Sequence, residues 1–255
     1  MKDMTVGILG VGHLTSHVVH GFAAKDLPFD ILLSPRNAEL AAELNAKFDL
    51  EIAADNAALV ERSDVVLIGV RQFQAVDVVR GLPWRADQTV VSLCAGLALA
   101  ELEPHVNGRA LVRAMPIIAA HYGESPTCVY PDNPIALDVL SRCGTTIALR
   151  SEDEFDAASV SACYSSWVLG VMARLTTWSE GAGLAPDTAR QIVTEMTRAA
   201  AIMARERTDG TIDDLIDELA TPRSFTQIGY ERLQAEDAFT PWNETAELVF
   251  DKLRG

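Results

Sequence analysis

A glycine-rich segment near the amino terminus has the residue types and spacing that bind a diphosphate. Gly10 and Gly12 lie in the run Gly7-Ile8-Leu9-Gly10-Val11-Gly12-His13-Leu14-Thr15, between an apolar stretch typical of a strand and a helical pattern. The first glycine permits a sharp bend, and the second lets the backbone approach a pyrophosphate at the start of the helix, where N–H groups are free. Thr15 stands where glycine or alanine packs closest, so the motif is imperfect. We expect a bound dinucleotide, and the alternative is an ordinary glycine turn.

The end of the second predicted strand bears on which dinucleotide is bound. Sites for NAD place an acidic residue about 20 residues downstream, where it holds the ribose 2′-hydroxyl. Here the sequence is Leu33-Ser34-Pro35-Arg36-Asn37, which offers a hydroxyl and a guanidinium but no carboxylate. An arginine fork suits a 2′-phosphate. The segment therefore favours NADP, and the alternative is that Arg36 is a plain surface residue.

The elements that must position these residues alternate between strand and helix. Apolar runs predict buried strands at 5–9, 31–33, 65–70, 89–93, 111–114, 127–129 and 145–149. Helical patterns follow the first two strands, over 13–24 and 38–48. This order predicts an α/β fold, a Rossmann-type doubly wound parallel sheet with helices on both faces. We assign residues 1–155 to this dinucleotide-binding domain.

The second part of the chain contains helical patterns and no strand-like alternation. Helices are predicted at 156–180, 186–207, 212–220, 225–236 and 242–253. The sequence thus predicts an all-helical carboxy-terminal domain over residues 156–255. Aliphatic and methionine positions along 157–178 and 192–203 recur at helical spacing, which indicates a core or a subunit interface.

Composition narrows the classes of partner. The 255 residues are 49% hydrophobic and 22% charged, with a net charge of −15. A net negative charge of this size disfavours binding to nucleic acid. No segment has the length of a membrane span or the pattern of a signal peptide. The four cysteines form no C-x-x-C pair and are expected to be buried thiols of a reducing compartment. We expect a cytoplasmic protein with a small-molecule partner.

Several motifs together resemble the pyrroline-5-carboxylate reductase family along nearly the whole chain. The glycine turn and the Ser34–Arg36 segment are similar in place and type. Further matches are Val70-Arg71 after the third-strand pattern, Ser92-Leu93-Cys94-Ala95-Gly96, Arg113-Ala114-Met115-Pro116, Gly183-Leu184-Ala185-Pro186 and Ala220-Thr221-Pro222. The resemblance implies an NADP-dependent oxidoreductase that acts on a C=N bond. It also implies a cofactor site made of Gly10, Gly12, His13, Leu14, Ser34, Arg36, Val70, Arg71, Ala95 and Gly96.

The departures from that family lie where the substrate should bind. Ile117-Ile118-Ala119 replaces the usual Asn-Thr-Pro, and Ser161-Ala162-Cys163-Tyr164-Ser165 replaces a Ser-Gly-Ser-Gly-Pro turn. Pro222-Arg223-Ser224-Phe225-Thr226 stands for a Pro-Gly-Gly-Thr-Thr loop that holds the substrate carboxylate. Pyrroline-5-carboxylate itself is therefore doubtful as the substrate.

Few side chains are needed for chemistry, because a nicotinamide cofactor carries the hydride. Thr226 is our candidate for a hydroxyl that positions the substrate or relays a proton, and the alternative is a helix N-cap. Ser161 is the second candidate. Arg223 could pair with an acidic substrate or fill the pocket. The β-hydroxy-acid dehydrogenases place a catalytic lysine on the interdomain helix, but residues 156–181 contain no lysine.

Three histidines, His13, His17 and His20, share one face of the first predicted helix. No Cys, Asp or Glu completes a metal site with them, so we predict no metal and expect partner contacts or solvent exposure. His121-Tyr122 could border the pocket. In the resembled family the helical half forms a dimer, and we expect a homodimer by analogy. The alternative function is a dinucleotide-binding sensor or partner protein that has lost catalysis.

Overall fold

The computed structural model describes residues 4–25, 27–106 and 110–254. The chain divides into two compact units, one up to Ala162 and one from Cys163 to Leu253. The division lies inside a single helix, α7 (Glu152–Gly181). Assigning 1–155 and 156–255 to cofactor and dimerisation domains stays a prediction about their roles.

The first unit contains an eight-stranded sheet, as far as the residues are described, with strand order β3-β2-β1-β4-β5-β6-β7-β8. The strands are β1 (Met4–Leu9), β2 (Phe29–Leu33), β3 (Glu51–Ile52), β4 (Val65–Ile68), β5 (Thr89–Ser92), β6 (Ala110–Met115), β7 (Thr127–Tyr130) and β8 (Thr146–Ala148). Every predicted strand is present. The two-residue β3 was not predicted, because so short a run carries no periodic signal.

One pairing departs from the predicted parallel sheet. β7 runs antiparallel to β6, whereas the other pairs, including β7 with β8, are parallel. A parallel crossover needs a dozen or more connecting residues, usually folded as an α-helix along the sheet. The connection here holds only the short 3-10 helix η1 (Ile118–Tyr122), so the chain returns in the opposite direction.

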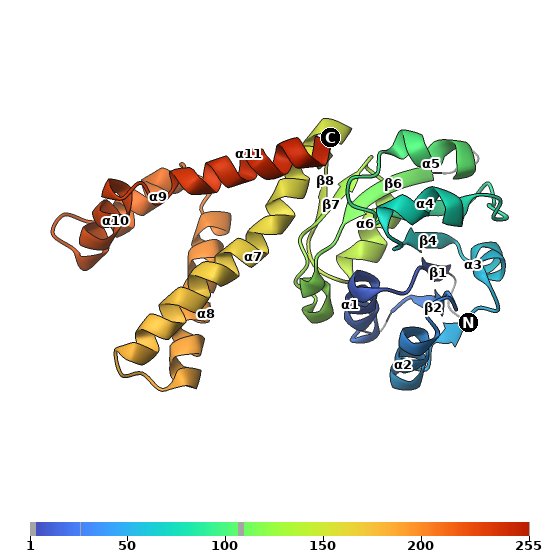
Figure 1. Ribbon diagram of the computed structural model, residues 1–255, viewed down its shortest axis with the longest axis horizontal. Coiled ribbons are helices and arrows are strands. Elements are labelled where there is room, and N and C mark those ends of the chain that lie inside the picture. The colour runs from blue at the N-terminus through green and yellow to red at the C-terminus, as the bar shows by residue number, and fades with distance from the viewer. Residues whose placement is uncertain (1–3, 26, 107–109, 255) are drawn as a thin grey trace. The chain divides into compact units, whose positions relative to one another are not determined.

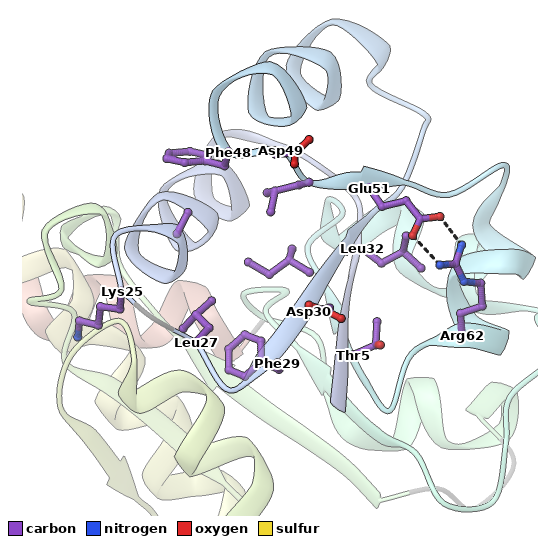
Figure 2. Close-up of a pocket in the computed structure, with 13 residues that line it drawn as sticks. Thr5, Lys25, Leu27, Phe29, Asp30, Leu32, Phe48, Asp49, Glu51 and Arg62 are labelled. Carbon is purple, nitrogen blue, oxygen red and sulfur yellow. Dashed lines mark hydrogen bonds and ion pairs between the residues drawn. The ribbon is translucent and has the colours of Figure 1, made fainter. Parts of the chain in front are cut away.

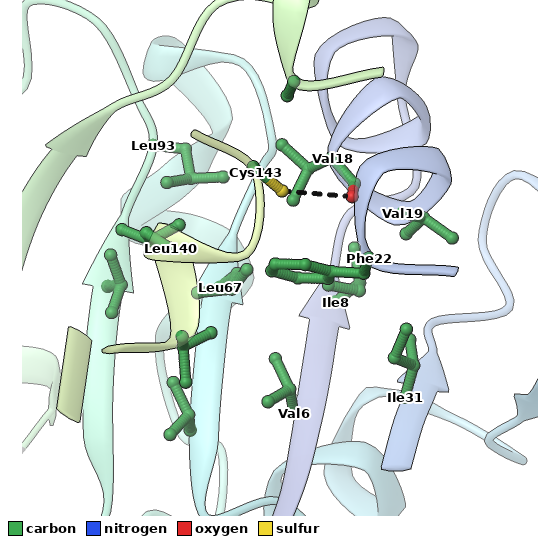
Figure 3. Packing of buried hydrophobic residues seen from close by; sticks show 14 of the residues in the cluster. Val6, Ile8, Val18, Val19, Phe22, Ile31, Leu67, Leu93, Leu140 and Cys143 are labelled. Carbon is green, nitrogen blue, oxygen red and sulfur yellow. Dashed lines mark hydrogen bonds between the residues drawn. The ribbon is translucent and has the colours of Figure 1, made fainter. Parts of the chain in front are cut away.

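Helices cover the sheet on two faces, as Figure 1 shows. One buried cluster gathers side chains of α1, α2 and α6, and the other gathers those of α3, α4 and α5. Their bounds are α1 (His13–Ala23), α2 (Ala38–Phe48), α3 (Asn56–Arg62), α4 (Gln72–Val79), α5 (Leu99–Val106) and α6 (Pro134–Ser141). In Figure 3 the fully buried ring of Phe22 packs toward Ile8 and Leu67. This double cover confirms the doubly wound α/β fold.

The sheet reverses its winding between β1 and β4. β1 pairs with β2 on one side and with β4 on the other, and the connections leave in opposite directions. In open α/β sheets, ligands bind in the crevice outside the carboxyl ends of the strands at such a switch point. The topology therefore directs attention to the segments that follow β1, β4 and β5.

The second unit is built from helices alone among its described residues. They are the later part of α7, α8 (Pro186–Glu206), α9 (Ile212–Leu219), α10 (Phe225–Ala235) and α11 (Thr240–Arg254). Many large apolar side chains of these helices are exposed, among them Leu169, Leu175, Trp178, Met196, Ile228 and Leu248. No described helix is long and apolar enough to cross a membrane.

The cysteines are all free thiols, and their burial differs. Cys94 and Cys143 are buried, while Cys128 and Cys163 are half-buried. The expectation that all four are buried is thus wrong for two of them. Cys163 begins the helical unit, whose faces remain partly exposed. Figure 3 shows the Cys143 thiol directed at α1, where it donates a hydrogen bond of 3.5 Å to the Val18 carbonyl.

Candidate functional site

A groove of about 870 Å³ lies at the carboxyl ends of β1, β4 and β5. We call it the carboxyl-edge groove. It brings together eight of the ten residues predicted to bind the cofactor, namely Gly10, Gly12, His13, Leu14, Arg36, Val70, Arg71 and Ala95. The other two, Ser34 and Gly96, do not line it. The groove also has lining residues that sequence reasoning missed, including Asn37, Gln72, Phe73, Gln74, Leu93 and Cys94.

The glycine turn that closes β1 leaves no room for a side chain at its first glycine. Gly10 has φ +103°, and a Cβ there would lie 2.5 Å from Cγ1 of Val70. Its N–H donates a hydrogen bond of 2.9 Å to Oγ of Ser34, a side chain buried beneath the turn. Ser34 therefore supports the turn from below, whereas Gly10 itself faces the groove.

Thr15 changes the third position of the motif without opening it. Its hydroxyl donates a hydrogen bond of 2.9 Å to the Gly10 carbonyl and accepts one of 2.7 Å from the Gly12 N–H. The threonine methyl occupies space beside Gly69, where a Cβ would lie 2.1 Å from it. The close approach of α1 to the sheet therefore depends on Gly69, directly after β4, and not on a glycine at position 15 of α1. The imperfect motif still gives a closely packed turn.

Helix α1 starts directly after this turn with Gly12 at its N-cap and no side-chain cap. By contrast, α2 starts with a polar cap at Asn37 and α3 at Asp55, whereas α4 and α8 have no side-chain cap. The first N–H groups of an uncapped helix are available to a ligand, and the helix dipole favours a negative charge there. The start of α1 borders the groove, so the groove can receive a phosphate at this point.

The segment after β2 brings a charged side chain to the carboxyl-edge groove. Arg36 is exposed, lines the groove and makes no ion pair with any described residue. Its neighbour Asn37 donates a hydrogen bond of 3.1 Å from Nδ2 to the carbonyl of Val11. This contact ties the start of α2 to the glycine turn. Arg36 is thereby held at the groove with its guanidinium unengaged.

The turns after β4 and β5 are held to each other. Gln72 donates a hydrogen bond of 2.7 Å from Nε2 to the Gly96 carbonyl, and the Cys94 thiol lies 3.2 Å from the Val70 carbonyl. Burial raises the pKa of the Cys94 thiol, which keeps it neutral. Val70, Cys94 and Gly96 lie in segments that resemble the family, whereas Gln72 belongs to no motif. The signal that could have found Gln72 and Cys94 is their place directly after a predicted strand of a parallel sheet.

The histidines of α1 contact one another and His121 of η1. The His20 ring stacks on that of His121 with centroids 4.5 Å apart, and Nδ1 of His17 lies 3.4 Å from Nδ1 of His121. Nζ of Lys47 lies 3.1 Å from Nε2 of His20. Partial burial first, and then the neighbouring cations, lower the pKa of His17 and of His121. Within the described residues, no three His, Cys, Asp or Glu side chains are arranged to hold a metal ion.

The two predicted catalytic hydroxyls are both exposed. Ser161 lies on α7 in the first unit but does not line the groove. Thr226 is the second residue of α10, in the helical unit. The N-cap of α10 is Ser224, whose Oγ accepts the Gln227 N–H at 3.0 Å, so the alternative role of Thr226 as N-cap is wrong. The Thr226 hydroxyl therefore does not cap α10.

The residues before α10 form a strained and exposed segment. Arg223 has φ +69°, and its N–H donates a hydrogen bond of 2.6 Å to Oε1 of Gln227. Positive φ is uncommon for a residue other than glycine. Phe225 is 94% exposed, and the Arg223 guanidinium makes no ion pair among the described residues. The guanidinium of Arg223, the ring of Phe225 and the hydroxyl of Thr226 therefore belong to exposed residues of one short segment.

A second cavity, of about 380 Å³, lies near β2 and β3 and away from the predicted residues. Figure 2 shows its lining, with Phe29 and Leu32 on the sheet and the ion pair of Glu51 with Arg62 at one side. The Arg62 Nη1 to Glu51 Oε1 distance is 2.6 Å, and this hydrogen bond lowers the pKa of the Glu51 carboxyl. None of the predicted site residues lines this cavity.

Two family models match the chain. Residues 5–96 match the model described as NADP oxidoreductase coenzyme F420-dependent, and residues 152–249 match that of pyrroline-5-carboxylate reductase dimerisation. Curated relatives cover most of the chain. A pyrroline-5-carboxylate reductase of Pseudomonas aeruginosa is 26% identical over 80% of this chain and 79% of its own length. One of Methanosarcina acetivorans is 25% identical over 92% and 91%.

Solved structures share the fold along the whole chain. A 1-pyrroline-5-carboxylate reductase of Streptococcus pyogenes has a TM-score of 0.84 at 23% identity, covering 98% of both chains. A pyrroline carboxylate reductase of Plasmodium falciparum with NADP bound has a TM-score of 0.83 at 20% identity, covering 99% of this chain and 98% of its own. With the two matched models and the curated relatives, these findings confirm the resemblance seen in the motifs. The chain belongs to the pyrroline-5-carboxylate reductase family.

Proposed function

We propose that this protein is a cytoplasmic, NADP-dependent oxidoreductase that acts on a C=N bond of a small molecule. The observation that carries the proposal is the carboxyl-edge groove, where the Gly10 turn, the uncapped start of α1 and the unpaired Arg36 meet. Family membership supplies the class of reaction, because the relatives are pyrroline-5-carboxylate reductases. The four free thiols are consistent with a reducing compartment.

The residues of the groove fit a dinucleotide that carries an additional phosphate. Gly10 lets the turn pack against Val70, and a Cβ at Gly12 would meet only the Gly69 carbonyl at 3.8 Å, so the backbone at the start of α1 is open to a pyrophosphate. Arg36 would pair with the 2′-phosphate, because a guanidinium fork matches phosphate oxygens and no carboxylate stands at the end of β2. The cofactor, when bound, supplies the hydride. Val70, Arg71 and Ala95 would line the rest of its site.

The substrate is proposed to be an imine or amine that bears an acidic group. Arg223 is held in a strained turn with its guanidinium unpaired, so it would bind a carboxylate. Thr226 would position the substrate or relay a proton through its exposed hydroxyl, and Ser161 is the second candidate. Phe225 and Tyr164 are large where the family has small residues. They argue for a substrate other than pyrroline-5-carboxylate.

The active form is proposed to be a homodimer. The matched dimerisation model spans 152–249, and the helices of that segment expose Leu175, Trp178 and Met196. Apolar patches of this kind mark protein–protein contacts. Sedimentation equilibrium at micromolar concentration should give twice the chain mass of 27.6 kDa. A monomer alone would refute the dimer.

The test of the cofactor site is a fluorescence titration with NADPH and with NADH. We expect tighter binding of NADPH, and no binding of either nucleotide would refute the proposed function. A panel of cyclic imines and amino acids then follows NADPH oxidation and NADP reduction. Substrates with a carboxylate are expected to react best.

A non-catalytic sensor is the second candidate function, and the altered segment from Arg223 to Thr226 favours it. A sensor would bind NADPH without turnover on any member of the panel. Turnover that disappears in Thr226→Val, with NADPH binding kept, would favour the enzyme.

A further inference from the structure

A buried arginine joins the sheet to the first turn of α7. Arg113 on β6 has a side chain only 4% exposed, and its Nη1 and Nη2 bind Glu152 at 2.9 Å and Asp156 at 3.0 Å. Phe155 lies between these two acids in sequence, and its ring centroid is 4.3 Å from Cζ of Arg113. Arg113 Nε makes no hydrogen bond with the described residues. The carboxylates of Glu152 and Asp156 therefore neutralise the buried charge of Arg113.

Glu152 has a second contact that Asp156 lacks. Its Oε1 accepts the Leu99 N–H at 3.0 Å in addition to the bond from Arg113. Leu99 is the first residue of α5, and the residue before it is Ala98, whose side chain cannot accept a hydrogen bond. The first N–H groups of a helix need an acceptor, and a negative charge there is favourable. Within α5, Oε1 of Glu101 accepts the Ala98 N–H at 3.2 Å, and Glu152 supplies from α7 the acceptor for the next N–H, that of Leu99.

The start of α5 closes the turn that follows β5, residues 93–98. Leu93, Cys94 and Ala95 of this turn line the carboxyl-edge groove. On its other side the turn is held by Gln72, which binds the Gly96 carbonyl at 2.7 Å. A carboxylate that fixes the first N–H of α5 therefore fixes one side of the groove. The Glu152 side chain itself does not line the groove.

We propose that Glu152, oriented by Arg113, is a positioning residue for the dinucleotide through its cap on α5. The proposal rests on the proposed function, because it takes the groove to be the cofactor site. Asp156 shares the same guanidinium without touching α5, so it is a matched control. Both acids pair with Arg113, and of the two only Glu152 accepts the Leu99 N–H.

The experiment compares Glu152→Ala, Glu152→Gln and Asp156→Ala in the full chain by NADPH fluorescence titration. Losing a helix cap is expected to raise the NADPH Kd about fivefold to tenfold in Glu152→Ala. Glu152→Gln keeps an acceptor oxygen and should recover part of that loss. The NADPH Kd of Asp156→Ala should stay within about twofold of that of the parent protein. The thermal stability of this variant should fall, because the buried charge of Arg113 keeps only one of its two carboxylate partners.

Hydrogen–deuterium exchange without any nucleotide measures the cap directly. The Leu99 amide should exchange faster in Glu152→Ala than in Asp156→Ala. Equal NADPH affinities in the two alanine variants, or equal exchange at Leu99, would overturn the proposal. If the parent protein binds no nucleotide, the proposed function fails and the positioning role falls with it. The exchange difference would then still identify Glu152 as the cap, so the two failures are distinguishable.

Discussion

Replacing Arg36 by aspartate should separate NADPH from NADH binding. Arg36 follows β2, lines the groove in an exposed position and forms no ion pair with the residues that the structure describes. A charge-assisted hydrogen bond to phosphate contributes about 1.5–3 kcal/mol, and exposure to solvent places this one at the lower end. Losing the bond alone should weaken NADPH about tenfold, since 1.4 kcal/mol is a factor of about ten.

An aspartate at position 36 would add repulsion of the 2′-phosphate to that loss. We expect NADPH to bind about 100-fold more weakly in Arg36→Asp, with screening by salt reducing the difference. NADH lacks the extra phosphate, so its Kd should change by no more than about threefold. Fluorescence titrations of both nucleotides at low and high ionic strength measure the effect.

Arg80→Asp is the control for the change of net charge. Arg80 is an exposed arginine that ends α4, pairs with Asp77 at 3.5 Å and does not line the groove. This variant should leave both Kd values within about twofold, because distant exposed charges are screened. Equal losses of NADPH and NADH in Arg36→Asp would refute the assignment of the 2′-phosphate. So would an Arg80→Asp variant that behaves like Arg36→Asp.

Three further predictions address the histidines, the turn and the substrate side. The lowered pKa of His17 and of His121 means that the unfolded chain takes up protons first as the pH falls through about 6.5. The contribution of these two histidines to stability is therefore complete above that pH and is lost below it. In His121→Asn, Tm should depend less on pH between pH 7.5 and 5.5 than in the parent protein. Parallel Tm profiles for the two proteins would contradict this prediction. Gly69→Ala should destabilise the fold by about 1–3 kcal/mol in denaturant unfolding, because its Cβ meets the Thr15 methyl at 2.1 Å. Thr15→Ala in the same chain should restore part of that loss, and additive effects would show that the two residues do not share the space. Thr226→Val should lower kcat at least tenfold with an unchanged NADPH Kd, whereas an unchanged kcat would remove Thr226 from the chemistry.

The order of elements was predictable because two-sided burial leaves uninterrupted apolar runs. Val65–Ile68 and Thr89–Ser92 are buried at every position; the first is apolar throughout, and the second has Val90 and Val91 at its centre. The direction of β7 was not predictable in this way. Direction depends on the connection, and the short η1 between β6 and β7 gives no periodic pattern that identifies it.

The candidate site divides along a similar line. Gly10 was predictable because a backbone requirement, positive φ without space for Cβ, admits almost one residue type. Three other features were not predictable: the support from Ser34, the pairing of Thr15 with Gly69 and the cap from Glu152. Each depends on a side chain that meets a distant segment, and many residue types could have served there.

Arg223 shows how the substrate side can be interpreted from backbone conformation when motifs fail. Its φ of +69° lies in the region where glycine is favoured, and the resembled loop has glycine at this position. A side chain there costs about 1 kcal/mol or more, and here the Gln227 side chain holds the backbone in place. Glycine would remove this strain, so we expect the guanidinium to have a role of its own. That group makes no ion pair in the described part of a chain with net charge −15, so we expect its partner to be an acidic ligand.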